Sequence, residues 1–247
     1  MEAIQENQKS IEALGYSIFE GQLGMLNINQ KKIVNTINQY SYCIAESDSD
    51  FKKALQNSDI LLPDGIAIVL AVKLLTGKKI KKIAGADIHK HLLEELNKRN
   101  GSCFYLGSSQ ATLDKIKNRI SREYPKIKIQ TYSPPFQASF SEDENTKMIE
   151  AVNSFKPNVL FVGMTAPKQE KWSFENKDRL DTKVICSIGA VFDFYAGTVK
   201  RPNKIWIKLG LEWFIRLIKE PKRMSKRYLY YGPIYFYYVL KYLFKKK

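Results

Sequence analysis

Cys103-Phe104-Tyr105-Leu106-Gly107-Ser108-Ser109, followed by the amphipathic residues 110–123, is the stretch that decides the fold of this chain. A short apolar run ends at a glycine, and a segment with helical periodicity begins shortly after it. This order is typical of a strand, a tight turn and a helix, the unit from which parallel sheets are built. The same pattern predicts strands at residues 32–37, 59–62, 103–106, 127–131, 158–162 and 184–188.

Amphipathic segments alternate with these strands. They predict helices at residues 49–56, 66–75, 86–98, 110–123, 142–155, 167–178 and 205–219. The 247 residues, 44% of them hydrophobic and 26% charged, suffice for one globular domain with an appendage. We therefore expect an α/β fold, in which ligands gather at the carboxyl ends of the parallel strands.

The positive charge of the chain is concentrated in residues 198–247. This fifth of the chain holds fourteen Lys and Arg against two acids, whereas residues 1–197 hold 26 basic and 23 acidic residues. Nine aromatic residues lie between 228 and 244, a stretch that Gly232-Pro233 should interrupt and that is too short, at about 26 Å as a helix, to span a bilayer. We divide the chain into a core, 1–197, and an appendage, 198–247. The appendage suits an anionic membrane surface or, alternatively, nucleic acid.

The first residues of the chain and two short motifs indicate where the protein acts and whether it binds a metal. The first residues are acidic and polar, unlike a signal peptide, so a cytoplasmic protein is expected. Asp48-Ser49-Asp50 resembles a cation-binding D-x-D motif, but its place before a helix makes capping the better explanation. His89 and His91 are two residues apart on a predicted helix and cannot share one face, so we expect no metal site.

Three strand ends carry a glycine: Gly107, Gly163 and Gly189. Backbone N–H groups and the dipole of the following helix could hold a phosphate at such turns. None of the three matches a dinucleotide-binding or P-loop motif, and each glycine alone could simply serve a tight turn. Three together favour a nucleotide-binding crevice.

Several polar residues also follow strands. Asp64, directly after a strand and before a helix, is either an N-cap or a general base at the mouth of a crevice. Thr36, Asn38 and Gln169 could hydrogen-bond a sugar or cap helices. Asp193, between two aromatic residues, belongs either to a pocket or to a structural salt bridge.

Many short motifs in a fixed order resemble the WecG/TagA/CpsF family of bacterial glycosyltransferases, over about residues 30–230. The matching motifs are Thr36-x-Asn38, Pro63-Asp64-Gly65, Ala84-Gly85-Ala86-Asp87, Gly163-x-x-Ala166-Pro167-x-Gln169-Glu170, Gly189-x-x-Phe192-Asp193-x-x-Ala196-Gly197, Arg201-Pro202, Gly210-Leu211-Glu212-Trp213-x-x-Arg216-Leu217 and Glu220-Pro221-x-Arg223. One departure is Lys82, where the family has arginine; lysine cannot make the same bidentate contact.

The resemblance implies an inverting, metal-independent transferase that needs no cofactor. It would move N-acetylmannosamine or a related hexose from a UDP-sugar to a polyprenyl-diphosphate-linked acceptor, at the inner face of the cell membrane and in cell-surface polysaccharide synthesis. The implied fold is a Rossmann-related parallel sheet with helices on both faces. A C-terminal helical appendage would touch lipid and close over the active site. Nucleic acid is not an expected partner, and the oligomeric state is left open.

The same resemblance implies roles for individual residues. Asp64 would be the catalytic base, Thr36, Asn38 and Gln169 would surround the sugars, and Asp193 would share their pocket. The cationic residues of the appendage would face the diphosphate: Arg216, Arg223, Lys226 and Arg227. The glycine turns and these cations would stabilise the charge on the departing UDP.

The alternative is a non-enzymatic module that binds nucleotides or nucleic acid through the basic appendage. It predicts steeply salt-dependent retention on single-stranded nucleic acid without turnover. Release of UDP from a UDP-sugar would distinguish the two, because only a transferase breaks that bond.

Overall fold

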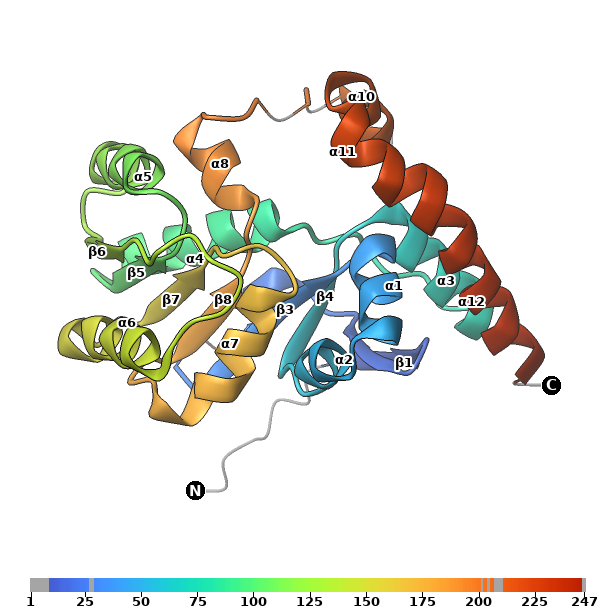
Figure 1. Ribbon diagram of the computed structural model, residues 1–247, viewed down its shortest axis with the longest axis horizontal. Helices are drawn as coiled ribbons and strands as arrows, with labels where there is room; N and C mark the ends of the chain where they lie inside the picture. Colours follow the sequence, from blue (N-terminus) through green and yellow to red (C-terminus); the bar gives the residue numbers. More distant parts are fainter. Residues whose placement is uncertain (1–8, 27–28, 201, 204, 207–210, 246–247) are drawn as a thin grey trace.

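A computed structural model describes residues 9–26, 29–200, 202–203, 205–206 and 211–245, without the side chains of Arg223 and Lys245. Its centre is a six-stranded sheet in the order β4-β3-β8-β7-β5-β6, and all of its pairings are parallel (Figure 1). The strands are β3 Lys32–Ile37, β4 Ile60–Pro63, β5 Ser102–Leu106, β6 Lys128–Tyr132, β7 Val159–Val162 and β8 Val184–Ser187. The predicted α/β fold with a parallel sheet is thereby confirmed.

Helices cover both faces of this sheet (Figure 1). Successive residues of a strand point to opposite faces, so Phe104 and Tyr105 belong to different core clusters. The face of Tyr105 packs on α4 Gly85–Lys98, α5 Gln110–Glu123 and α8 Val191–Ala196. The face of Phe104 packs on α6 Glu142–Phe155 and α7 Lys168–Asn176.

A third cluster fills the end of the sheet near β4. It contains residues of α1 Gln39–Ser47, α2 Ser49–Gln56, α3 Ile66–Thr76 and a hairpin formed by β1 Ser10–Ala13 and β2 Tyr16–Phe19. The sequence patterns did not predict the hairpin, because its two turn residues are Leu14 and Gly15. Both have a positive φ, 58° and 80°, and leucine at such a position is not a recognisable turn signal.

The sequence patterns also did not predict helix α1, Gln39–Ser47. Its N-cap is Asn38, whose side-chain oxygen accepts hydrogen bonds from the backbone N–H groups of Tyr40 and Ser41. The Ser41 hydroxyl in turn accepts from the backbone of Asn38, which completes a capping box. Asn38 therefore serves the capping role that the sequence had left open, in addition to any contact with a ligand.

The appendage consists of helices that return to the core. They are α10 Glu212–Lys219, α11 Pro221–Ser225, the π-helix η3 Lys226–Tyr230 and α12 Tyr231–Lys245. Of the predicted helix 205–219, residues 205 and 206 are helical and residues 207–210 lie outside the described part, as does Arg201. Among the described residues, no helix is long and apolar enough to cross a membrane.

The expectation that Gly232-Pro233 interrupts the aromatic stretch is wrong. Both residues lie in the first turn of α12, which continues directly from the π-helix η3, so the helical path runs past them without a break. Helix α12 lies beside α1 and α3 (Figure 1), and its Tyr235 and Val239 are buried in the same cluster as Tyr42. The ring of Tyr42 packs edge-on against Tyr235, with centroids 5.4 Å apart. The end of the appendage is therefore part of the hydrophobic core.

Candidate active site

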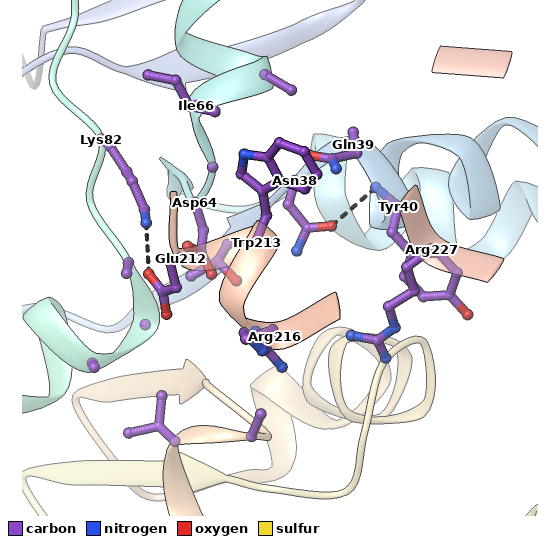
Figure 2. Close-up of a pocket in the computed structure, with 18 of the residues that line it drawn as sticks. Asn38, Gln39, Tyr40, Asp64, Ile66, Lys82, Glu212, Trp213, Arg216 and Arg227 are labelled. Atoms are coloured by element: carbon purple, nitrogen blue, oxygen red, sulfur yellow. Dashed lines mark hydrogen bonds and ion pairs between the residues drawn. The ribbon is translucent and has the colours of Figure 1, made fainter. Parts of the chain in front are cut away.

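A pocket of about 600 Å³ lies at the carboxyl ends of β4, β3 and β8, a volume typical of small-molecule sites. The core supplies one wall, from Thr36, Asp64 and Ala190 among others. The appendage supplies the other, from α10 and η3 (Figure 2). Core and appendage thus form one site together.

Asp64 lies directly after β4, and its backbone N–H donates to the carbonyl of Ile37 at the end of β3 (2.8 Å). The N-cap of the following helix, α3, is Gly65 and not Asp64. Gly65 has a φ of 143°, which favours glycine, and this turn leaves the Asp64 carboxylate on the pocket wall (Figure 2). Helix capping therefore does not explain an acid at this position.

Two arginines of the appendage line the same pocket. The guanidinium of Arg216, on α10, lies 5.5 Å from the ring centroid of Phe194, and its buried Nε has no hydrogen-bond partner among the described residues. The guanidinium of Arg227, on η3, lies over the ring of Tyr40 at 4.5 Å. Planar guanidinium groups held in this way suit the bidentate recognition of phosphate oxygens.

Lys82 connects the two walls. Its Nζ lies 2.9 Å from Oε2 of Glu212 on α10, and both side chains are largely buried, with 23% and 13% exposed (Figure 2). This ion pair holds α10 against the core at the pocket rim. Lys82 lines the pocket, and its charge is already matched by the Glu212 carboxylate.

The pocket brings opposite charges around the hydroxyl of Tyr228. Burial raises the pKa of Tyr228, and the nearby carboxylates of Glu212 and Asp64 act in the same direction. Arg216 and Arg227 lower it. All four charged residues also line the pocket, so the core carboxylate and the appendage cations share one environment.

Two of the predicted sugar ligands, one in β3 and one directly after it, lie in this pocket. Thr36 and Asn38 both line it, and the amide nitrogen of Asn38 points into it while the oxygen caps α1 (Figure 2). Lys226 is exposed and is not among the lining residues. The side chain of Arg223 lies outside the described part of the structure.

Gln169 and Asp193 are not among the residues that line the pocket. The Gln169 Nε2 donates to Oε1 of Glu170 (2.9 Å), and a Cβ at Gly189 would come within 2.8 Å of the Gln169 Oε1. Gln169 thus packs against the turn whose neighbours, Ile188 and Ala190, line the pocket. Asp193 Oδ1 accepts from the Thr198 hydroxyl at 3.3 Å, and Asp193 lies in the first turn of α8.

The glycines after β5 and β7 are packed closely. A Cβ at Gly107, whose φ is 105°, would lie 2.7 Å from the carbonyl oxygen of Gly163, and a Cβ at Gly163 would lie 2.6 Å from the ring of Phe192. Neither glycine lines the pocket. Close packing explains both, and a nucleotide-binding role for Gly107, Gly163 and Gly189 stays a prediction.

The candidate metal ligands have structural roles. Asp48 caps α2 by accepting from the backbone N–H of Phe51 (3.0 Å) and pairs with Lys171 (2.6 Å), as the capping interpretation predicts. His89 is buried against the Tyr105 hydroxyl (2.6 Å), and burial lowers its pKa to about 3. No group of three or more His, Cys, Asp or Glu that could hold a metal occurs within the described ranges.

Among the pocket residues to which the sequence patterns gave no role are Glu212, Trp213 and Tyr228. The first two precede Arg216 by four and three residues, so they lie on the same side of α10, and this spacing was a signal that could have been used. Tyr228 carried no such signal, because its approach to Asp64 depends on how the appendage folds back.

Glu170 is a buried acid, and burial raises the pKa of its carboxyl to about 7. Between its usual pKa and about 7, the folded protein holds a proton that the unfolded chain releases. The free energy of unfolding should therefore fall as pH rises through this window, by about 3 kcal/mol, and then level off. Glu170→Gln should abolish this decline in a series of melting temperatures from pH 5 to 8. Glu175→Gln, an exposed acid of the same helix, should retain it; parallel curves for all three proteins would contradict the assignment.

Comparison with known proteins shows which family this chain resembles over most of its length. Residues 11–247 match the sequence profile described as "Glycosyl transferase WecG/TagA/CpsF family". A Bacillus subtilis (strain 168) protein named "N-acetylglucosaminyldiphosphoundecaprenol N-acetyl-beta-D-mannosaminyltransferase" is 34% identical over 81% of this chain and 77% of its own length. Proteins of the same name from Bacillus spizizenii and Staphylococcus aureus (strain MW2) are 27% and 24% identical, over 81% and 80% of this chain and 76% and 75% of their own lengths.

Proposed function

Because the chain belongs to the WecG/TagA/CpsF family and is therefore a glycosyltransferase, we propose that it transfers an N-acetylmannosamine-type hexose from a UDP-sugar to a polyprenyl-diphosphate-linked acceptor. Because this is a family of glycosyltransferases, membership argues against a module that only binds nucleotides or nucleic acid. The names of the relatives support the acceptor, since they specify a diphosphoundecaprenol-linked sugar. The proposal rests chiefly on one observation: a core carboxylate, Asp64, and two appendage arginines line the same pocket.

The proposed reaction is a single displacement. A hydroxyl oxygen of the acceptor sugar bonds to C1 of the donor sugar, while the bond from C1 to the UDP oxygen breaks and UDP leaves with the electron pair. Attack from the face opposite UDP inverts the configuration at C1. The Asp64 carboxylate takes the hydroxyl proton as the new bond forms, a contribution typically worth about 10²- to 10⁴-fold in rate.

The departing diphosphate needs positive charge. Arg216 and Arg227 meet this need from the appendage wall, where their guanidinium groups would donate hydrogen bonds to phosphate oxygens. Lys82 contributes a third cation, which a diphosphate would draw away from Glu212. Thr36 and the amide nitrogen of Asn38 hydrogen-bond the sugars.

The proposed place of action is the inner face of the cell membrane, where the appendage attaches peripherally. Helix α10 carries exposed Trp213, Phe214 and Ile218 close to the basic residues Arg216 and Lys219. Apolar side chains enter the interface, and each cation near an anionic leaflet adds about 1 kcal/mol.

Transfer is expected to proceed without a divalent cation. Asp48, the first acid of the D-x-D motif, is occupied by helix capping and by Lys171. The charge on the leaving group is matched in our proposal by side-chain cations. Adding EDTA should therefore leave the initial rate of UDP release unchanged, and a strong loss of rate that Mg²⁺ or Mn²⁺ restores would contradict metal independence.

The test of the proposed function is a panel of UDP-sugars offered with a short-chain prenyl-diphosphate-linked N-acetylglucosamine. Mass spectrometry should detect one added N-acetylhexosamine on the acceptor, with UDP released in equal amount and only when the acceptor is present. Release of UDP with water as the sole acceptor, or no product with any donor, would overturn the proposal.

A further inference from the structure

Helix α3 is apolar on both of its faces. Its sequence, Ile-Ala-Ile-Val-Leu-Ala-Val-Lys-Leu-Leu-Thr, contains one charged residue. Ile68, Ala71 and Val72 are buried against the core, as one face of a surface helix should be. The outer face, where polar residues are expected, carries large apolar side chains next to the single lysine, Lys73. Ile66, Leu70 and Leu74 are 40%, 56% and 54% exposed.

These three residues form one row, here called the α3 row. They are four residues apart, so they lie above one another on the helix over a length of about 12 Å. Contiguous exposed apolar side chains on a protein surface mark an interaction site. A ligand that binds along the α3 row should therefore itself be apolar and elongated.

The α3 row begins inside the candidate active site. Ile66 lines the pocket and is two residues from Asp64; Figure 2 shows it at the start of α3. From there the row leads away from the pocket, on a helix that packs beside α12 (Figure 1). One end is thus fixed at the catalytic carboxylate and the other lies out on the surface.

We propose that the α3 row binds the first isoprene units of the lipid-linked acceptor. The inference rests on the proposed function, in which the diphosphate of this acceptor enters the pocket. A polyprenyl chain joined to that diphosphate must leave the pocket, and an apolar row that starts at the pocket wall gives it a path along which both surfaces lose contact with water. Continuity with the pocket distinguishes this occupant from a bilayer or a second copy of the chain, neither of which requires a row that begins beside Asp64.

The experiment measures binding of geranyl, farnesyl and geranylgeranyl diphosphate to the full chain by calorimetry, below their micelle concentrations. For the wild type, the Kd should fall by about tenfold from the shortest to the longest chain, since each added unit buries further apolar surface. In the double variant Leu70→Gln/Leu74→Gln, most of this gain should disappear while the Kd of geranyl diphosphate stays within about twofold. Leu74→Gln alone should weaken only the longer chains.

Phe136→Gln is the matched control, because Phe136 is a fully exposed aromatic residue in the loop between β6 and α6. It should keep the wild-type dependence on chain length. The inference is overturned if the wild type shows no gain with chain length, or if the double variant keeps the gain. It is also overturned if the double variant loses only its binding to anionic vesicles, because the row would then contact the bilayer.

This experiment does not depend on turnover. Failure of the donor and acceptor panel would refute the proposed function even if prenyl diphosphates bind along α3. Transfer without a chain-length effect of Leu70 and Leu74 would refute the α3 row alone. Melting temperatures near the wild-type value will verify that the variants fold, as expected for substitutions at exposed positions.

Discussion

Asp64→Asn is expected to lower kcat by about 10²- to 10⁴-fold, the usual contribution of a general base. The asparagine side chain has nearly the same shape but cannot accept the proton of the acceptor hydroxyl. Stability should change little, because Gly65, not Asp64, caps α3, and the backbone hydrogen bond to Ile37 is retained. UDP release at saturating donor and acceptor measures the effect directly.

The matched control is Asp50→Asn, an acid in the first turn of α2 that does not line the pocket. It should transfer sugar at the wild-type rate. Binding of UDP to Asp64→Asn, measured by calorimetry, should stay within a few-fold of wild type, because in our proposal the carboxylate acts on the acceptor. Comparable kcat values for Asp64→Asn and wild type would exclude Asp64 as the base.

Arg216→Ala is expected to lower kcat/KM by about 10²- to 10³-fold, similar to the loss of one preorganised donor at a developing negative charge. Binding of the UDP-sugar donor should weaken, because in our proposal the guanidinium contacts the leaving diphosphate and not the acceptor hydroxyl. Arg216→Lys should recover part of the loss: it restores the charge but not the planar bidentate group.

Lys219→Ala separates this effect from a general loss of positive charge. Lys219 lies on the same helix, is exposed and does not line the pocket. Its removal should leave kcat/KM with a soluble acceptor unchanged and weaken binding to anionic vesicles. If Lys219→Ala and Arg216→Ala lowered transfer to a soluble acceptor equally, the appendage would act through its overall charge and not through a specific contact.

The sheet could be predicted because its signals are local. Each buried strand is a short apolar run that ends at a glycine, proline or polar turn, and the helix that follows has its own periodicity. Segments such as 110–123 therefore had correct bounds without any knowledge of tertiary structure. The position of Asp64 at the pocket followed from the same rule, since the carboxyl ends of parallel strands meet at one edge.

The features that were missed depend on distant contacts. Residues 231–245 form one helix because Tyr235 and Val239 pack into the core beside Tyr42, almost two hundred residues earlier. The Lys82–Glu212 pair likewise joins residues far apart in the sequence. Gln169 stays a predicted sugar ligand, and its position beside the Gly189 turn depends on the packing of α7 against β8. Periodicity and spacing contain no information on such contacts.

In our proposal, the core carboxylate of Asp64 and the appendage arginine Arg216 stabilise the same transition state, in which the donor sugar passes from UDP to the acceptor hydroxyl. The most direct measurement is a double-mutant cycle of UDP-release rates for wild type, Asp64→Asn, Arg216→Ala and the double variant. If both groups stabilise one transition state, the double variant should be slower than the worse single variant by no more than about tenfold. Losses that multiply in full would mean that the two residues act independently, and the account of a shared site would be wrong.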